Sequence, residues 1–172
     1  MKNPTAAFLP IVVAIAVVFM LWAVGHGRPV HAAGDPIVVI VNVSNPVENL
    51  SLSELKKMFL SERSRWDTGK SVAPVIVTAG APERKAFLKI VFGMSDADFS
   101  NYFMQAAFTG KSATPPKEVN SPSALKSFVA SSAGAIGFVK ALDFHGDGSD
   151  GGVKAVKIDG LSAADAGYKL RM

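Results

Sequence analysis

The chain has 172 residues, 49% of them hydrophobic and 19% charged, with a formal net charge of +4. This length allows one domain with a hydrophobic core. The lack of cysteine excludes a disulfide framework, a thiol nucleophile and a thiolate metal site. The sequence also lacks the basic stripe with interleaved aromatic residues that would indicate a nucleic-acid partner.

The first 32 residues have the pattern of a secretory signal peptide. Lys2 precedes a run that is apolar from Ala6 to Gly25 apart from Pro10, and small residues lead to a cleavage motif, VHA, ending at Ala32. The apolar run is also long enough to span a bilayer, so an uncleaved inner-membrane anchor is the alternative. Either interpretation places residues 33–172 outside the cytoplasm, in the periplasm or its equivalent, and the membrane is contacted only through an uncleaved leader.

Residues 33–172 offer little for catalysis. They carry 16 basic and 14 acidic residues and a single histidine, His145. A zinc site built from several histidines is excluded by counting, and no nucleophile or carboxylate lies at a convincing spacing from His145. We therefore predict a protein that is not an enzyme and that holds no cofactor and no metal.

The first predicted elements are a strand, a helix and a second strand. PIVVIVN (36–42) is a short branched apolar run, typical of a buried strand. Ser51 and Glu54 have capping-box spacing and open an amphipathic helix over 51–59. After a polar loop, VAPVIVT (72–78) predicts the next strand.

Three more helices and two more strands follow. Pro82 opens a helix that closes at Gly93, Ser95 and Asp98 cap the next one, and Ser121 caps the last. A loop is expected over 109–120, and strands are expected over 134–139 and 153–158. This alternation predicts an α/β layer with a mostly parallel or mixed sheet flanked by helices. Ligands bind such sheets beyond the carboxyl ends of the strands, here in loops 42–51, 78–83 and 139–152.

Two glycines interrupt the apolar stretch SSAGAIGFVK. Glycine weakens a strand interior, so each position needs a reason. Gly134 fits a turn before the strand, and Gly137 fits a close approach of the backbone to a neighbour or to a ligand. Packing is the simpler explanation for Gly137.

The order of motifs resembles the phosphate-binding-protein-like family of periplasmic substrate-binding proteins, in particular its short, single-lobe members. The most specific pieces are FTGK with the following PP, at 108–111 and 115–116, and GAIGFV, at 134–139. The resemblance implies one lobe of a type-2 periplasmic binding fold over 33–172, non-catalytic binding of a small oxyanion such as phosphate, and a link to an ABC transporter.

The turn that would hold the anion departs from the family pattern. Full-length phosphate binders have a Gly-Ser-Gly-Thr-like turn at a helix N-terminus. Here Gly80 and Ala81 lead to Pro82, which lacks an N–H, and to Glu83, which is negative. Arg84 is retained.

Two segments are candidate anion sites, each with a structural alternative. Thr78, Gly80 and Arg84 either hold an anion or form a strand-to-helix turn whose Arg84 is solvated or paired with Glu83 or Asp67. Thr109, Gly110 and Lys111 either contact an anion or partner or belong to a structural loop made rigid by two prolines and pinned by Phe108.

Two further clusters are interpreted as structural. SERSRWDTGK (61–70) groups basic residues around Trp66 and is expected to be a solvated loop with one packed aromatic. HGDGSDGG (145–152) fails the calcium-loop pattern, because Lys154 stands where a bidentate Glu is needed, and is expected to be a turn.

Two functions remain open from the sequence. The first is a binding module for a small anion or for a partner. The second is an envelope interaction or regulatory protein that keeps the fold, has lost ligand binding, and acts through a protein partner or self-association. An exposed apolar patch would indicate a partner surface.

Overall fold

The computed structural model describes residues 34–146 and 150–172, and residues 34–172 form one compact unit. The expected signal peptide or anchor, residues 1–32, lies outside the described residues. Within those two ranges, no helix is both long enough and apolar enough to cross a membrane.

Six strands form one sheet in the order β2-β6-β1-β5-β3-β4. The central strand β1 is antiparallel to both β5 and β6, whereas β3 is parallel to β4 and β5, and β2 is parallel to β6. The predicted α/β class with a mixed sheet is confirmed, and a mostly parallel sheet is not found at its centre. The strands span Ile37–Asn42 (β1), Asn49–Leu50 (β2), Ala73–Val77 (β3), Lys117–Val119 (β4), Ala135–Lys140 (β5) and Val153–Ile158 (β6).

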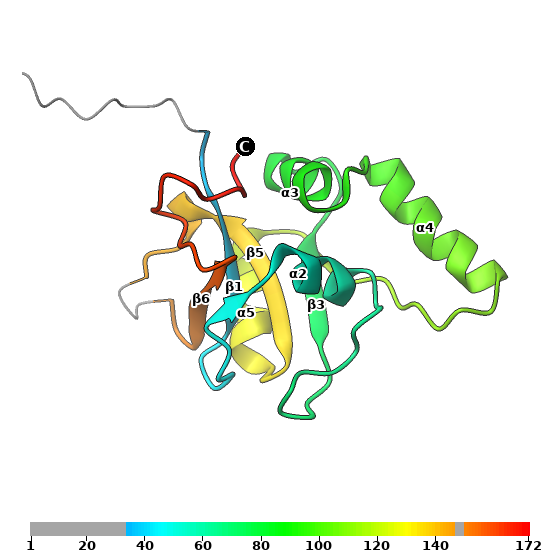
Figure 1. Ribbon diagram of the computed structural model, residues 1–172, viewed down its shortest axis with the longest axis horizontal. Helices are drawn as coiled ribbons and strands as arrows, with labels where there is room; N and C mark the ends of the chain where they lie inside the picture. Colours follow the sequence, from blue (N-terminus) through cyan, green and yellow to red (C-terminus); the bar gives the residue numbers. More distant parts are fainter. Residues whose placement is uncertain (1–33, 147–149) are drawn as a thin grey trace, which may run out of the picture. The chain divides into compact units, whose positions relative to one another are not determined.

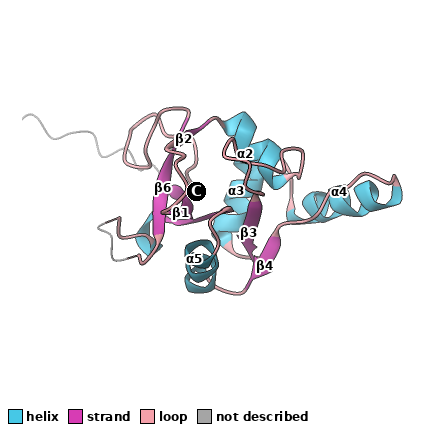
Figure 2. Cartoon of the chain, turned by 90° about the horizontal axis from the view of Figure 1, so that it is seen from below, coloured by secondary structure: helices cyan, strands magenta, loops and turns pink. Residues whose placement is uncertain are grey.

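Helices cover both faces of this sheet (Figure 1). Figure 2 shows α5 on one side and α2 and α3 on the other. Every residue of β1 is buried, as a strand covered on both faces requires. Its odd-numbered side chains join an aromatic-rich core with α2, α3 and α4, and Val38 and Ile40 join a smaller core with α5. The helices span Leu52–Phe59 (α2), Pro82–Phe92 (α3), Asp96–Phe108 (α4) and Pro122–Ser131 (α5), and Ala141–Asp143 forms a 3-10 turn (η2).

The predicted helix ends are confirmed. Ser51 with Glu54, and Ser95 with Asp98, form complete capping boxes, and Ser121 caps α5. Gly93 ends α3 in the left-handed conformation, at φ 71°.

Two short strands differ from the sequence prediction. β4 lies inside the stretch predicted as a loop over 109–120, and β2 lies in the loop after β1. Both are edge strands of two or three residues, and Lys117 and Glu118 carry no apolar alternation. Tertiary pairing therefore creates them, and the local pattern does not reveal them.

Both glycines of β5 and its turn mark close packing. A Cβ at Gly137 would lie 2.7 Å from Leu125 Cδ2 and 2.9 Å from Val75 Cγ1, in the core beneath α5. A Cβ at Gly134 would lie 2.0 Å from the Ser71 carbonyl oxygen, so the turn also needs a close backbone approach. The packing interpretation of Gly137 is confirmed.

Replacing Gly137 with Val should lower the free energy of unfolding by about 1–3 kcal/mol, because the branched side chain overpacks the core under α5. Urea denaturation measures the change. Ala155→Val, at an exposed position on β6, is the matched control and should leave stability nearly unchanged. An unchanged midpoint for Gly137→Val would contradict the close-packing explanation.

Candidate functional site

The carboxyl ends of β3, β4 and β5 meet at one edge of the sheet, because these three strands are parallel. At this edge Thr78, Ala79 and Gly80 form an exposed turn into α3. The Thr78 N–H donates to the Val119 carbonyl oxygen at 2.8 Å, and Gly80 has φ 94°, where glycine is favoured. The turn is thus anchored to β4 and presents its outer side to solvent.

Arg84 lies beneath this turn and is only 2% exposed. One guanidinium nitrogen donates to the Val77 carbonyl oxygen at 2.8 Å and to Glu118 at 2.7 Å, and Nε donates to Asp96. The structural alternative drawn from the sequence placed Arg84 on a solvated face or paired it with Glu83 or Asp67, and this was wrong, because Arg84 is buried and pairs with Asp96 and Glu118. The cation joins β3, β4, α3 and the start of α4, and an incoming anion would compete with two carboxylates for it.

Glu83 and Lys140 form the second charged pair at this edge. Glu83 is buried in the first turn of α3, and its Oε2 lies 3.4 Å from Lys140 Nζ at the end of β5. That oxygen accepts no hydrogen bond from the described residues. The pair therefore sets an incompletely satisfied carboxylate and a lysine beside the N-terminus of α3, where the helix dipole favours negative charge.

Sequence reasoning did not single out Lys140. The available signal was its position directly after the strand predicted over 134–139, at the start of a loop expected to bind ligand. Its pairing partner Ile37 opens β1, and the Ala141 N–H donates to the Pro36 carbonyl oxygen at 2.8 Å. These backbone bonds fix the point at which Lys140 leaves the sheet.

The second predicted anion segment, residues 109–111, follows the C-terminal end of α4, the end opposite to the one that contacts Arg84 (Figure 1). Thr109 Oγ1 donates to the carbonyl oxygens of Gln105 and Ala106, and Gly110 has φ 72°. These contacts cap a helix C-terminus, whose partial negative charge does not favour an anion. Since Asp96 at the start of α4 contacts Arg84, the length of the helix, about 20 Å for its 13 residues, separates Lys111 from the Thr78 turn.

Phe108 does not pin the loop after α4, contrary to the sequence expectation, because its side chain is 83% exposed. The loop is instead held by the Ser61 hydroxyl, which donates to the Thr114 carbonyl oxygen, and by the burial of Pro116.

The loop over 61–70 is structural. Trp66 is buried, and its indole N–H donates to the Gly134 carbonyl oxygen at 2.9 Å. Arg63 pairs with Glu54 at 2.8 Å and with Asp67 at 2.6 Å. The expected arrangement of a solvated loop with one packed aromatic is confirmed.

Asp150 belongs to the segment predicted as a glycine-rich turn over 145–152, of which residues 147–149 lie outside the described residues. Its carboxylate accepts from Lys126 Nζ at 2.8 Å and from the backbone N–H groups of His145 and Gly146. Burial alone raises the pKa of Asp150. The hydrogen bonds together lower it by more than burial raises it, so the pKa lies well below the ordinary value. In the described ranges no three acidic or histidine side chains converge as a metal site would need. The imidazole of His145 is exposed.

Three comparisons place the fold among known proteins. No family model matches the chain, and no curated protein matches it. Solved structures do match. A Vibrio cholerae ABC-type phosphate transport receptor is 23% identical with a TM-score of 0.60, over 76% of this chain and 49% of the receptor. A putative phosphate ABC transporter substrate-binding protein with bound phosphate, from Clostridium perfringens, is 25% identical with a TM-score of 0.58, over 76% of this chain and 48% of that one.

A possible phosphate-binding protein from Planctomyces limnophilus extends the match to 81% of this chain and 46% of its own, with 19% identity and a TM-score of 0.56. The chain therefore has the α/β fold of these substrate-binding proteins and spans about half their length. The resemblance stated from the sequence is confirmed as a likeness of fold.

Replacing Arg84 with Met should lower the free energy of unfolding by about 2–4 kcal/mol, because Asp96 and Glu118 lose the cation between them. Chemical denaturation measures the loss. Lys85→Met, at the exposed next position of α3, is the control and should change stability little. Equal stability of the two variants would contradict the bracing role of Arg84.

Asp150→Asn should destabilise the protein at neutral pH, and the difference from wild type should shrink as pH falls. The folded pKa of Asp150 lies below the unfolded value of 3.8, so its contribution is full well above 3.8 and is lost as pH falls through the folded pKa. Denaturation of both proteins at neutral and acidic pH tests this. A difference independent of pH would contradict it.

Proposed function

We propose that the described domain is a non-catalytic binding module that takes a small oxyanion such as phosphate at the exposed turn between β3 and α3. Thr78 and Gly80 supply the turn, Lys140 supplies the positive charge, and Arg84 braces the turn from beneath. Thr109, Gly110 and Lys111 take no part in this site, because they lie at the other end of α4.

The observation that carries the proposal is the contact between Lys140 and Glu83 at the first turn of α3. An oxyanion beside this turn would meet a lysine and the N-terminal end of a helix, a combination that favours negative charge. The matching structures support the choice of ligand, since they are named as phosphate receptors or phosphate-binding proteins and one holds phosphate. Their names, as binding and transport proteins, also support a non-catalytic role.

Affinity should be weak. Thr78, Ala79 and Gly80 are exposed, whereas binding pockets normally cover most of a ligand's surface. Glu83 also opposes an anion and occupies Lys140. A second surface placed over the turn would raise affinity by excluding water.

We place the protein outside the cytoplasm on the sequence pattern of residues 1–32, as a periplasmic protein or one anchored in the inner membrane. This location suits a module related in fold to transport receptors.

A second candidate is an envelope interaction or regulatory protein that has lost anion binding. Two observations favour it: Pro82 removes a donor N–H from the turn, and Glu83 places a carboxylate where the anion would sit. The two functions differ in whether the turn binds an anion at all.

Replacing Glu83 with Gln should strengthen phosphate binding, because it frees Lys140 and removes the opposing charge. The effect is measured by titrating the 34–172 fragment with phosphate and recording its melting temperature. Sulfate and small carboxylates serve as competitors. The melting temperature of wild type should rise at millimolar phosphate, and that of the variant at lower concentration.

Glu83→Gln combined with Lys140→Gln is the matched control, since neither residue is then charged, and it should show no phosphate-dependent shift. Lys154→Gln on β6 should behave as wild type. A phosphate response that persists without Lys140 would remove it from the site. No response in wild type or in Glu83→Gln would favour the interaction protein.

A further inference from the structure

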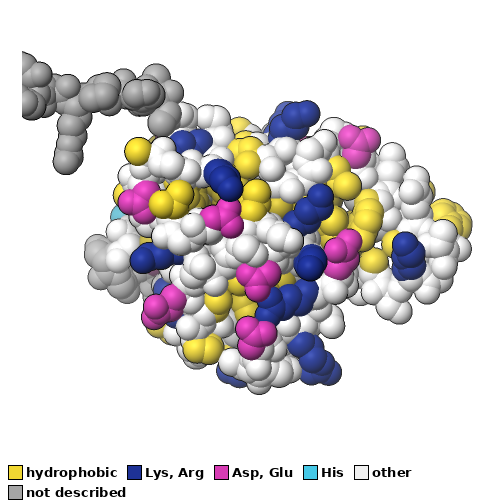
Figure 3. Space-filling model, viewed as in Figure 1, with side chains coloured by type: hydrophobic (Ala, Val, Ile, Leu, Met, Phe, Trp, Pro, Cys, Tyr) yellow, Lys and Arg dark blue, Asp and Glu magenta, His cyan; other side chains and the backbone are white. Residues whose placement is uncertain are grey.

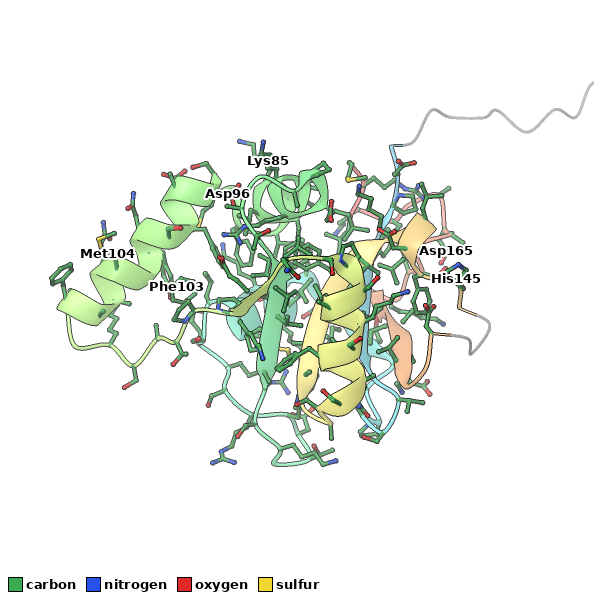
Figure 4. The ribbon with its side chains drawn as sticks, turned by 180° about the vertical axis from the view of Figure 1, so that it is seen from behind. Lys85, Asp96, Phe103, Met104, His145 and Asp165 are labelled. Carbon is green, nitrogen blue, oxygen red and sulfur yellow. The ribbon has the colours of Figure 1, made fainter. Side chains whose placement is uncertain are left out.

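Helix α4 has two faces. Phe99, Phe103 and Ala106 are buried, and the ring of Phe99 packs between Phe92 of α3 and Phe103. Figure 4 shows Phe103 on the side toward the domain and Met104 on the side away from it. At 100° per residue, the face opposite the buried one carries Ala97, Asn101, Met104 and Phe108. Their spacing of four, three and four residues is that of a helix-pairing seam.

This outer face is unusually apolar for a surface. The side chain of Phe108 is 83% exposed and that of Met104 is 54% exposed, one helical turn apart. No charged residue occurs from Phe99 to Gly110, although a solvated helix face normally carries charges. Figure 3 shows apolar atoms at the end of α4 farthest from the sheet. Such a face indicates a partner surface.

We propose that this seam, Ala97, Asn101, Met104 and Phe108, pairs with the same seam of a second copy of the chain, with the two α4 helices antiparallel. An antiparallel two-fold arrangement sets each position against a different one. Phe108 of one copy meets Ala97 of the other, and Met104 meets Asn101. The largest exposed ring thus faces the smallest side chain of the seam, which permits close packing.

Charge at the two ends of α4 selects this orientation. Asp96 and Asp98 stand in the first turn, and Lys111 is the first basic residue beyond the helix. In the antiparallel pair, the end of one α4 that leads to Lys111 lies beside the acidic first turn of the other. The helix dipoles are then opposed, which is favourable, whereas a parallel pair would bring acid against acid.

One helix pair is a small interface, below the area typical of stable dimers. The dimer should therefore be weak and depend on protein concentration. The seam shares no residue with the proposed anion site, so the dimer does not rest on the proposed function.

The test uses the 34–172 fragment, which contains both hydrophobic cores. Sedimentation from micromolar to millimolar protein concentration measures its oligomeric state. Wild type should pass from monomer to dimer. Phe108→Lys should weaken the dimer at least about ten-fold without lowering the melting temperature, because the side chain is exposed. Leu142→Ser, which removes another exposed apolar residue, at 76% exposure, is the control and should leave the dimer unchanged.

Because the chain lacks cysteine, introduced thiols report the orientation. A mixture of Ala97→Cys and Phe108→Cys proteins should oxidise mainly to the mixed disulfide. Preferential formation of the disulfide between two Ala97→Cys chains would overturn the antiparallel arrangement.

A fragment that stays monomeric at millimolar concentration would overturn the proposal. The competing partner is a lipid surface, tested with phosphatidylglycerol vesicles. A monomer that binds these vesicles and loses binding in Phe108→Lys would assign the seam to membranes in place of a second copy.

Discussion

The buried guanidinium of Arg84 is the contact on which the candidate site depends. It reaches the end of β3, a carboxylate of β4 and a carboxylate at the start of α4 from the first turn of α3. The end of β3, the starts of α3 and α4 and the more distant strand β4 are thereby held around one charge. These contacts hold the start of α3, at Pro82, beside the ends of β3 and β4. The Thr78 turn that leads into α3 is exposed, and Glu83 in the first turn of that helix contacts Lys140. Arg84, which the sequence offered as an anion ligand, is thus held in contacts within the protein, and the proposed anion site takes its positive charge from Lys140 at the end of β5.

A second constraint is the close packing of β5. Gly137 lets Leu125 and Val75 approach the strand, and Gly134 lets the Ser71 carbonyl approach the turn before it, while Trp66 donates to the carbonyl of Gly134. These contacts fix the path of β5 between β1 and β3. Its last residue, Lys140, consequently leaves the sheet at the edge where α3 begins. Packing at one end of the strand therefore positions the charge at the other.

Local signals in the sequence predicted most of the fold. Each of these signals lies within a few neighbouring residues: the capping boxes at Ser51 and Ser95, the helix end at Gly93 and the branched apolar run of β1. The mixed sheet, β4 and the partners of Arg84 could not be read in this way, because each depends on segments far apart in the chain. Glu118 lies 34 residues from Arg84. The exposure of Phe108 was mispredicted for the same reason, since periodicity does not show which face of α4 meets the domain.

The proposed binding of an oxyanion at the turn between β3 and α3 is tested most directly by a phosphate titration of the isotope-labelled 34–172 fragment, monitored by its amide NMR shifts. We expect the shifts to concentrate at 78–84 and around Lys140, with the far end of α4 unaffected. Shifts confined to other regions, or none at millimolar phosphate, would contradict it.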